Sequence, residues 1–140
     1  MLLVQLLDIN EKPIHPKSNQ MSTTITKSFC LDAEALETIE DNCCGWCDWT
    51  SEIWFNINEE APESSTIKVV EEHDEMEGSV THYFSVKQLE EAFEPCIKAV
   101  NSDIASYLVD FIDTNDAGHL DAEASDCLLQ FACFGELVYG

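Results

Sequence analysis

The stretch SEIWFNINEEAPESSTIKVVEEHDEMEGSVTHYF, residues 51–84, decides the fold of this chain. Apolar and polar residues alternate over residues 51–58, which predicts a half-buried strand. After an acidic Pro/Ser loop, residues 66–70 and 79–84 are rich in β-branched and aromatic side chains and flank the turn-like residues 74–78. The stretch therefore predicts three consecutive strands, of which the last two form a hairpin.

Helices are predicted on both sides of these strands. Asp32 can cap a helix that precedes them, since apolar residues recur at helical spacing after it. Ser85 and Gln88 form a capping box at the start of a helical stretch that Pro95 either kinks or restarts. A further helix follows, and Asp121 can cap the last one.

The order of these elements predicts a single α+β domain. Residues 22–30 add one more strand before the first helix, which gives the order β-α-β-β-β-α-α-α. We expect a small antiparallel sheet of three to four strands packed against three to four helices, formed by residues 21–140. Residues 1–20 are either an N-terminal extension or an edge strand followed by a linker.

The charge of the chain is its most unusual property. Twenty-eight acidic residues oppose six basic ones, the formal net charge is -22, and every basic residue is a lysine. Because arginine is the preferred phosphate ligand, this composition argues against direct binding to nucleic acid, and the same field would repel an anionic membrane. So much like charge on one small domain calls for a reason, which is either a cationic partner or solubility and salt adaptation.

The acidic residues gather in three places. On the helix after Asp32, three of them repeat about every 5 Å along the axis, an order of spacing comparable with the charges of a DNA strand. Others surround the predicted hairpin and follow the Ser85 capping box. The candidate partner-binding surface consists of Glu34, Glu37, Asp41, Glu59, Glu60, Glu63, Glu71, Glu72, Asp74, Glu75, Glu77, Glu90, Glu91 and Glu94.

The seven cysteines predict reduced thiols in a cytoplasm. Their number is odd, and the apolar start of the chain is too short for a signal sequence or a membrane span. The pair Cys44 and Cys47 has the spacing of a redox motif but follows a helix, where the dipole and the nearby Asp41 and Asp48 raise a thiol pKa. We expect cysteines that pack as small hydrophobic residues, and no zinc site.

One loop has the partial pattern of a calcium site. Asp113, Asn115 and Asp121 occupy ligand positions, but Ala117 and Ala124 stand where two further oxygen ligands belong. A helix–turn–helix connection with Gly118 in a left-handed turn is the preferred interpretation, and no metal or cofactor is expected. No arrangement typical of a catalytic site is found in the sequence, so we expect a protein that is not an enzyme.

The C-terminal region resembles that of small acidic phage proteins of unknown function. The resemblance rests on DAGHLDA at residues 116–122, on QFACFGELVYG at residues 130–140, and on GWCDW at residues 45–49. It extends over about residues 22–140 and implies a phage origin and a location in the cytoplasm of the host bacterial cell. It carries over no catalytic residue.

The sequence therefore predicts a phage-encoded inhibitor that mimics nucleic acid. It would occupy the cationic groove of a basic host protein that binds nucleic acid or serves in defence. It would thus be an inhibitor of the anti-restriction or anti-CRISPR type. The alternative is a virion structural or assembly protein whose acidity serves solubility and docking, and a third possibility is a protein that binds a metal or a small ligand. Both a monomer and a homodimer are compatible with the sequence.

Overall fold

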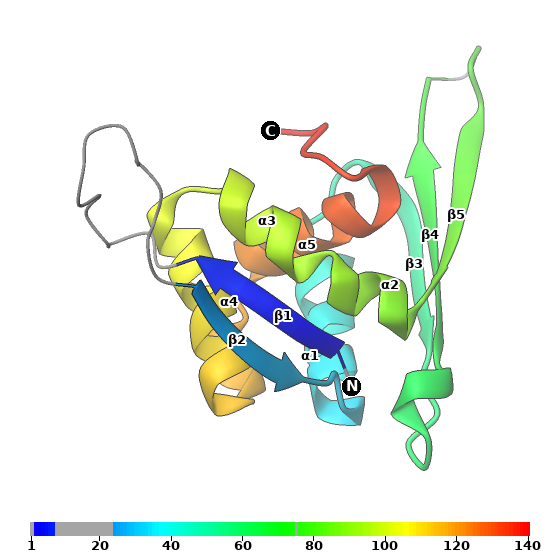
Figure 1. The fold of residues 1–140 in the computed structure, drawn as a ribbon. Coiled ribbons are helices and arrows are strands. Elements are labelled where there is room, and N and C mark those ends of the chain that lie inside the picture. Colours follow the sequence, from blue (N-terminus) through cyan, green and yellow to red (C-terminus); the bar gives the residue numbers. More distant parts are fainter. Residues whose placement is uncertain (1, 8–23, 75) are drawn as a thin grey trace, which may run out of the picture.

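The strands and helices follow the predicted order with two differences: a strand is added at the N-terminus, and the helical stretch after the hairpin is divided into α2 and α3, which makes five α-helices instead of the expected three to four (Figure 1). The computed structural model describes residues 2–7, 24–74 and 76–140, with residues 2–7 and 24–27 described by their backbone alone. The strands are β1 (Leu2–Leu7), β2 (Thr24–Phe29), β3 (Thr50–Asn56), β4 (Thr66–Glu72) and β5 (Ser79–Ser85). The α-helices are α1 (Ala33–Cys44), α2 (Val86–Glu91), α3 (Phe93–Ala99), α4 (Ser102–Thr114) and α5 (Ala122–Phe134), and η1 (Pro62–Ser64) and η2 (Ala117–His119) are short 3-10 helices.

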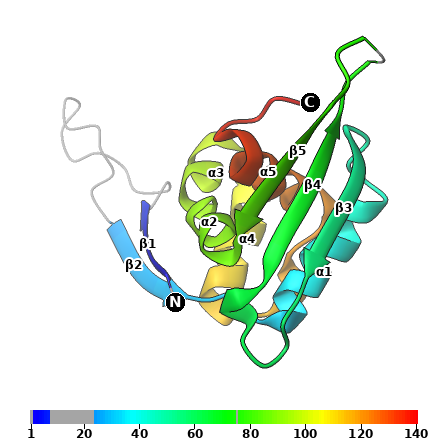
Figure 2. The same cartoon turned by 90° about the vertical axis from the view of Figure 1, so that its right-hand side faces the viewer.

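Strands β3, β4 and β5 form the predicted antiparallel sheet in that order. Helices cover one face of this sheet, which is its inner face, and the opposite face is turned toward the viewer in Figure 2. The register places Trp54, Lys68 and Tyr83 side by side across the three strands. The side chains of Trp54 and Tyr83 are exposed, whereas Phe55, one position along β3, is buried against the helices. The α+β class and the three-stranded sheet are thus confirmed.

Strand β2 does not join this sheet. It pairs instead with β1 in an antiparallel hairpin whose register runs from Leu2 opposite Phe29 to Leu7 opposite Thr24. The hairpin contacts α2, α3 and α4, and the two views place it and the three-stranded sheet on different sides of the helices. The predicted linker after residue 7 and the predicted domain start at residue 21 lie outside the described residues.

The predicted helix starts are confirmed. The side chain of Asp32 accepts a hydrogen bond from the backbone N–H of Ala35, and Asp121 caps α5 in the same way. Ser85 and Gln88 form a complete capping box ahead of α2. Pro95 marks a new helix, because it lies in the first turn of α3, where its missing N–H would have no partner in the helix.

The turn after α4 differs from the prediction. The left-handed residue there is Asn115, with φ of 58°, whereas Gly118 lies in η2 without a positive φ. The N–H of Asn115 makes the last helical hydrogen bond, to the carbonyl of Phe111, and the left-handed conformation of Asn115 then ends α4, since asparagine tolerates this conformation better than most residues. The glycine therefore has another role: a Cβ at Gly118 would lie 3.1 Å from the carboxylate oxygen of Asp116 that caps η2.

Two aromatic clusters hold the layers together. Phe29, Phe93 and Phe111 join β2, α3 and α4 with ring centroids 4.9 to 6.3 Å apart. Trp49 stacks on Tyr139 in the C-terminal segment at 5.3 Å, with the two rings nearly parallel. Phe134, at the end of α5, contacts both of these rings. The second cluster fixes the chain end beside the inner face of the sheet.

Candidate functional site

Most of the acidic side chains that the structure describes are exposed to solvent. On α1, Glu34, Glu37 and Asp41 lie on the side opposite Leu36 and Ile39, which are fully buried. The other exposed members of the predicted surface are Glu59, Glu60, Glu63, Glu72, Asp74, Glu77 and Glu91, and Glu94 is partly exposed. Glu75 lies outside the described residues. The acidic residues thus occupy α1, the loop before β4 and the β4–β5 turn.

Few cations oppose these acids within the described part of the chain. The Nζ atom of Lys68 lies 3.2 Å from a carboxylate oxygen of Glu52, and the Nζ of Lys98 lies 3.3 Å from one of Glu94. Both pairs are partly exposed, so each contributes little to stability. Their main consequence is electrostatic: two of the lysines are already neutralised locally, and the remaining carboxylates set the field around the protein.

Two residues of the predicted surface are buried and do not belong to it. Glu71 is 7% exposed and Glu90 is 6% exposed. Glu71 shares the inner face of β4 with Ile67 and Val69, because side chains alternate between the two faces of a strand. Glu90 accepts a hydrogen bond of 2.9 Å from the backbone N–H of Leu31 and so links α2 to the segment before α1. Burial raises the pKa of Glu90, and this hydrogen bond partly offsets that effect.

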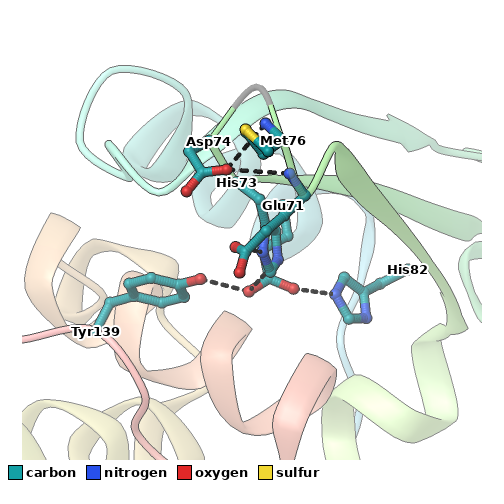
Figure 3. A network of polar contacts seen from close by, with 7 residues as sticks. Glu71, His73, Asp74, Met76, His82 and Tyr139 are labelled. Atoms are coloured by element: carbon teal, nitrogen blue, oxygen red, sulfur yellow. Dashed lines mark hydrogen bonds and ion pairs between the residues drawn. The ribbon is translucent and has the colours of Figure 1, made fainter.

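Glu71 is the centre of a polar network between the sheet and the C-terminal segment (Figure 3). One carboxylate oxygen accepts a hydrogen bond from the hydroxyl of Tyr139, and the other lies 3.0 Å from Nε2 of His82. Nε2 of His73 lies 3.2 Å from the first oxygen, and the Nδ1 of the same ring lies 3.2 Å from Glu77. A single buried carboxylate thereby joins β4, β5, the hairpin turn and the chain end.

The network keeps Glu71 ionised. Burial by itself would raise the pKa of Glu71, but the contacts with Tyr139, His82 and His73 outweigh it and hold the pKa below its ordinary value. In return, the hydrogen bond to Glu71 raises the pKa of Tyr139 to about 12. The carboxylates of Glu77 and Glu71 raise the pKa of His73. All these shifts favour an ionised Glu71 that accepts bonds from protonated partners. We call Glu71, His73, His82 and Tyr139 the latch, because together they hold the C-terminal segment against the sheet.

Gln130 and Asp126 of α5 hold the same chain end from the other side. The side-chain oxygen of Gln130 accepts hydrogen bonds from the backbone N–H groups of Val138 and Tyr139, and its amide nitrogen donates to the carbonyl of Tyr139. Asp126 accepts a bond of 2.8 Å from the indole of Trp49, whose ring stacks on Tyr139. The C-terminal segment is therefore fixed by hydrogen bonds at both its backbone and its tyrosine.

Sequence reasoning did not identify this latch. It treated Glu71 as part of an acidic run and assigned no role to His73 and His82. One signal was present: the alternation of Ile67 and Val69 places Glu71 two residues further on the same face. The contact with Tyr139, 68 residues away along the chain, has no local signal.

The prediction for the cysteine pair is confirmed for the raised thiol pKa values, but Cys44 does not pack as a small hydrophobic residue. Cys44 ends α1 and is exposed, and Cys47 is buried. Burial, together with Glu40 and Asp41, raises the pKa of Cys44, whereas a hydrogen bond with Cys43 and burial raise that of Cys47. Asp126, which accepts a bond of 3.2 Å from the Cys47 thiol, replaces the predicted Asp48 as the nearby acid. Protonated thiols are poor nucleophiles, so this pair lacks the property that a redox site requires.

The loop with the partial calcium pattern uses its polar groups to close helices. Asn115 ends α4, Asp116 caps η2 and Asp121 caps α5. Asp113 and Asn115 also line a shallow cavity of about 260 Å³ together with Ser28 and Cys30. Among the residues that the structure describes, no group of three or more histidine, cysteine or acidic side chains is arranged to hold a metal ion.

Comparison with family models, with curated proteins and with solved structures finds no match for this chain. The resemblance to acidic phage proteins therefore stays a prediction. Within the described residues, no helix is both long enough and apolar enough to cross a membrane.

Proposed function

We propose that this protein is a phage-encoded inhibitor that mimics nucleic acid in the cytoplasm of the host bacterium. It occupies the cationic groove of a host protein that binds nucleic acid or serves in defence, of the kind that anti-restriction and anti-CRISPR proteins block. The observation that carries the proposal is that a folded domain exposes most of its described acids, while Lys68 and Lys98 are already paired with carboxylates.

The mechanism is occupancy without a catalytic step. Carboxylates of α1 and of the β4–β5 turn contact the lysine and arginine side chains that otherwise hold phosphates. The exposed rings of Trp46 and Trp54, each 52% exposed, add apolar contact and stack on arginine side chains. Long-range attraction between oppositely charged surfaces also speeds association at low salt. Binding should therefore weaken steeply as salt increases.

The α1 acids supply the most direct test. The triple variant Glu34→Gln, Glu37→Gln, Asp41→Asn removes the acid row while leaving the buried face of α1 unchanged. A matched control, Asp103→Asn, Glu123→Gln, Glu136→Gln, removes the same charge from exposed positions outside the proposed surface. In a pull-down from host lysate over a salt series, the α1 variant should lose a partner that the control retains, and added duplex DNA or RNA should compete for that partner.

Three results would contradict the proposal. One is a low-salt pull-down that recovers no protein with nucleic-acid-binding activity. Another is a bound partner that ignores added nucleic acid. The third is mass spectrometry of purified phage particles that finds the protein as an abundant component, since this would favour the virion structural role.

A further inference from the structure

Strand β5 is an edge strand whose exposed positions hold no charged side chain. Its sequence, SVTHYFS at residues 79–85, lacks acidic and lysine residues in a chain of which 24% is charged. It lies at one end of the sheet order β3-β4-β5, and Thr81 and Tyr83 are exposed, the latter to 73%. Edge strands are normally guarded by charges, proline, bulges or a covering segment, because their free backbone groups pair with other strands. The sequence of β5 contains no acidic or lysine residue and no proline.

Three hydrogen bonds reveal which backbone groups of β5 point away from the sheet. The N–H of Phe55 donates to Glu40 outside the sheet, and the N–H of Glu72 donates to the carbonyl of Trp49 on the β3 side. The backbone N–H and C=O groups point to alternate sides from one residue to the next along a strand. The groups of Val69 therefore point toward β5 and bond to those of His82. It follows that the N–H groups of the odd-numbered residues of β5 point away from the sheet. The N–H of Ser85 agrees, because it bonds outside the sheet to Gln88.

Ser79, Thr81 and Tyr83 therefore present their N–H groups at the free edge. Within the described part of the chain, none of these three N–H groups donates a hydrogen bond to a side chain, a turn or a loop. The other edge of the sheet is guarded: Glu40 of α1 accepts the Phe55 N–H at 2.7 Å, and β3 has an irregularity in its pairing between Thr50 and Glu52. At the β5 edge, by contrast, all three of these N–H groups are free within the described residues.

We infer that β5 pairs with β5 of a second copy of this chain, in antiparallel orientation, to form a continuous six-stranded sheet. A two-fold axis at Thr81 places Thr81 opposite its own counterpart and Ser79 opposite Tyr83 of the other copy. All three free positions of each strand are then paired at once, and a threonine facing a threonine is a favourable cross-strand pair. The inference does not depend on the proposed mimicry of nucleic acid.

Charge explains why a second copy fits this edge. Two molecules with a net charge of -22 repel each other, and β5 is a surface segment on which they can meet without like charges in contact. The antiparallel arrangement also moves the acidic β4–β5 turns to opposite ends of the shared sheet. There the turn with Asp74 and Glu77 of one copy approaches the end of β5 that leads to the exposed Lys87 of the other. Opposite charges thus flank an uncharged seam.

The test is sedimentation equilibrium of the full chain over a range of protein and salt concentrations. We expect a monomer–dimer equilibrium that tightens at least about ten-fold from about 0.05 M to about 0.5 M salt, since salt screens repulsion between the copies. This dependence is opposite to that of a cationic partner, so failure of one idea is distinguishable from failure of the other. A chain that stays monomeric at about millimolar concentration and high salt would overturn the inference.

Variants at Thr81 locate the contact. Thr81→Pro removes the outward N–H at the axis while leaving the bonds between β4 and β5, so it should weaken the dimer at least about ten-fold. Thr81→Ala retains the N–H and should change it by less than about three-fold. Unchanged dimerisation of Thr81→Pro would overturn the inference. If that variant does not fold, Thr81→Glu places two carboxylates at the axis and should dissociate the dimer, whereas Asn56→Glu adds the same charge on β3 and should not.

Hydrogen exchange gives an independent reading of the same contact. In the dimer the amides of Thr81 and Tyr83 should become protected as protein concentration rises, whereas that of His82 is protected at every concentration because it bonds to β4. Equal, concentration-independent exchange of Thr81 and Tyr83 in a sample that sediments as a dimer would place the interface elsewhere.

Discussion

The neighbours Glu71 and Glu72 lie in opposite environments, one buried and one exposed. Glu72 is exposed at the end of β4, whereas Glu71, on the opposite face, is buried and contacts Tyr139, His82 and His73. The first adds to the field around the molecule, and the second holds its C-terminal segment. The comparison teaches that in a chain with 28 acids the environment of a carboxylate, and not its position in an acidic run, decides its role.

The largest expected effect comes from removing the buried carboxylate. Glu71→Ala should lower the free energy of unfolding by about 3 kcal/mol, since it removes the acceptor of the partly buried Tyr139 hydroxyl and of the His82 ring, and one of the two carboxylates beside His73. Glu72→Ala should change it by less than about 0.5 kcal/mol. Urea unfolding of both variants tests the contrast, and similar values for the two would refute it.

The same contrast should appear as a pH dependence. Because the pKa of Glu71 is lowered in the folded state, its stabilisation is present above the ordinary carboxylate pKa of about 4.3 and is lost as pH falls through the folded-state pKa. Glu71→Gln should therefore flatten the loss of thermal stability on the acid side. An acid-side slope identical to that of the wild type would show that other carboxylates cause it.

The tyrosine of the latch should account for a smaller part of the effect. Tyr139→Phe keeps the stacking on Trp49 but removes the hydroxyl that donates to Glu71, and we expect a loss of about 1.5 kcal/mol in the free energy of unfolding. Tyr107→Phe, at an exposed position of α4, is the control and should be nearly neutral. A neutral Tyr139→Phe would mean that the histidines alone satisfy Glu71.

Glu90 should respond to pH in the opposite direction from Glu71. Its pKa is raised by burial, so its ionisation lowers stability as pH increases between about 4.3 and the higher folded-state pKa. Glu90→Gln retains an acceptor for the Leu31 N–H, should remove this decline, and should change stability at neutral pH by no more than about 1 kcal/mol. Thermal unfolding over a pH series measures it, and a loss well above this value would mean that the charge itself is required.

The smallest effect on stability is expected for the exposed acids of α1. The triple variant Glu34→Gln, Glu37→Gln, Asp41→Asn should unfold within about 0.5 kcal/mol of the wild type, because it relieves repulsion and removes no buried contact. Calorimetry at low and high salt tests this, and a clear loss of stability would show that these acids have a structural role as well as a charge.

Local features of the sequence predicted much of the fold. Asp32, Ser85 with Gln88, and Asp121 cap helices through hydrogen bonds to residues three positions away, so their patterns are readable without knowledge of distant contacts. The hairpin of β4 and β5 is equally local. The predicted exposure of Glu90 was wrong because its partner, the N–H of Leu31, is 59 residues away.

The sequence by itself determined the α+β class, the helix caps and the large negative charge, because composition and short-range hydrogen bonds suffice to fix them. Only the tertiary structure decided that β2 pairs with β1, that Glu71 joins Tyr139 and two histidines, and that β5 lies at an edge of the sheet. These features depend on contacts between residues far apart in the chain. Packing of helices against a sheet brings such residues together, and no local pattern records which ones meet.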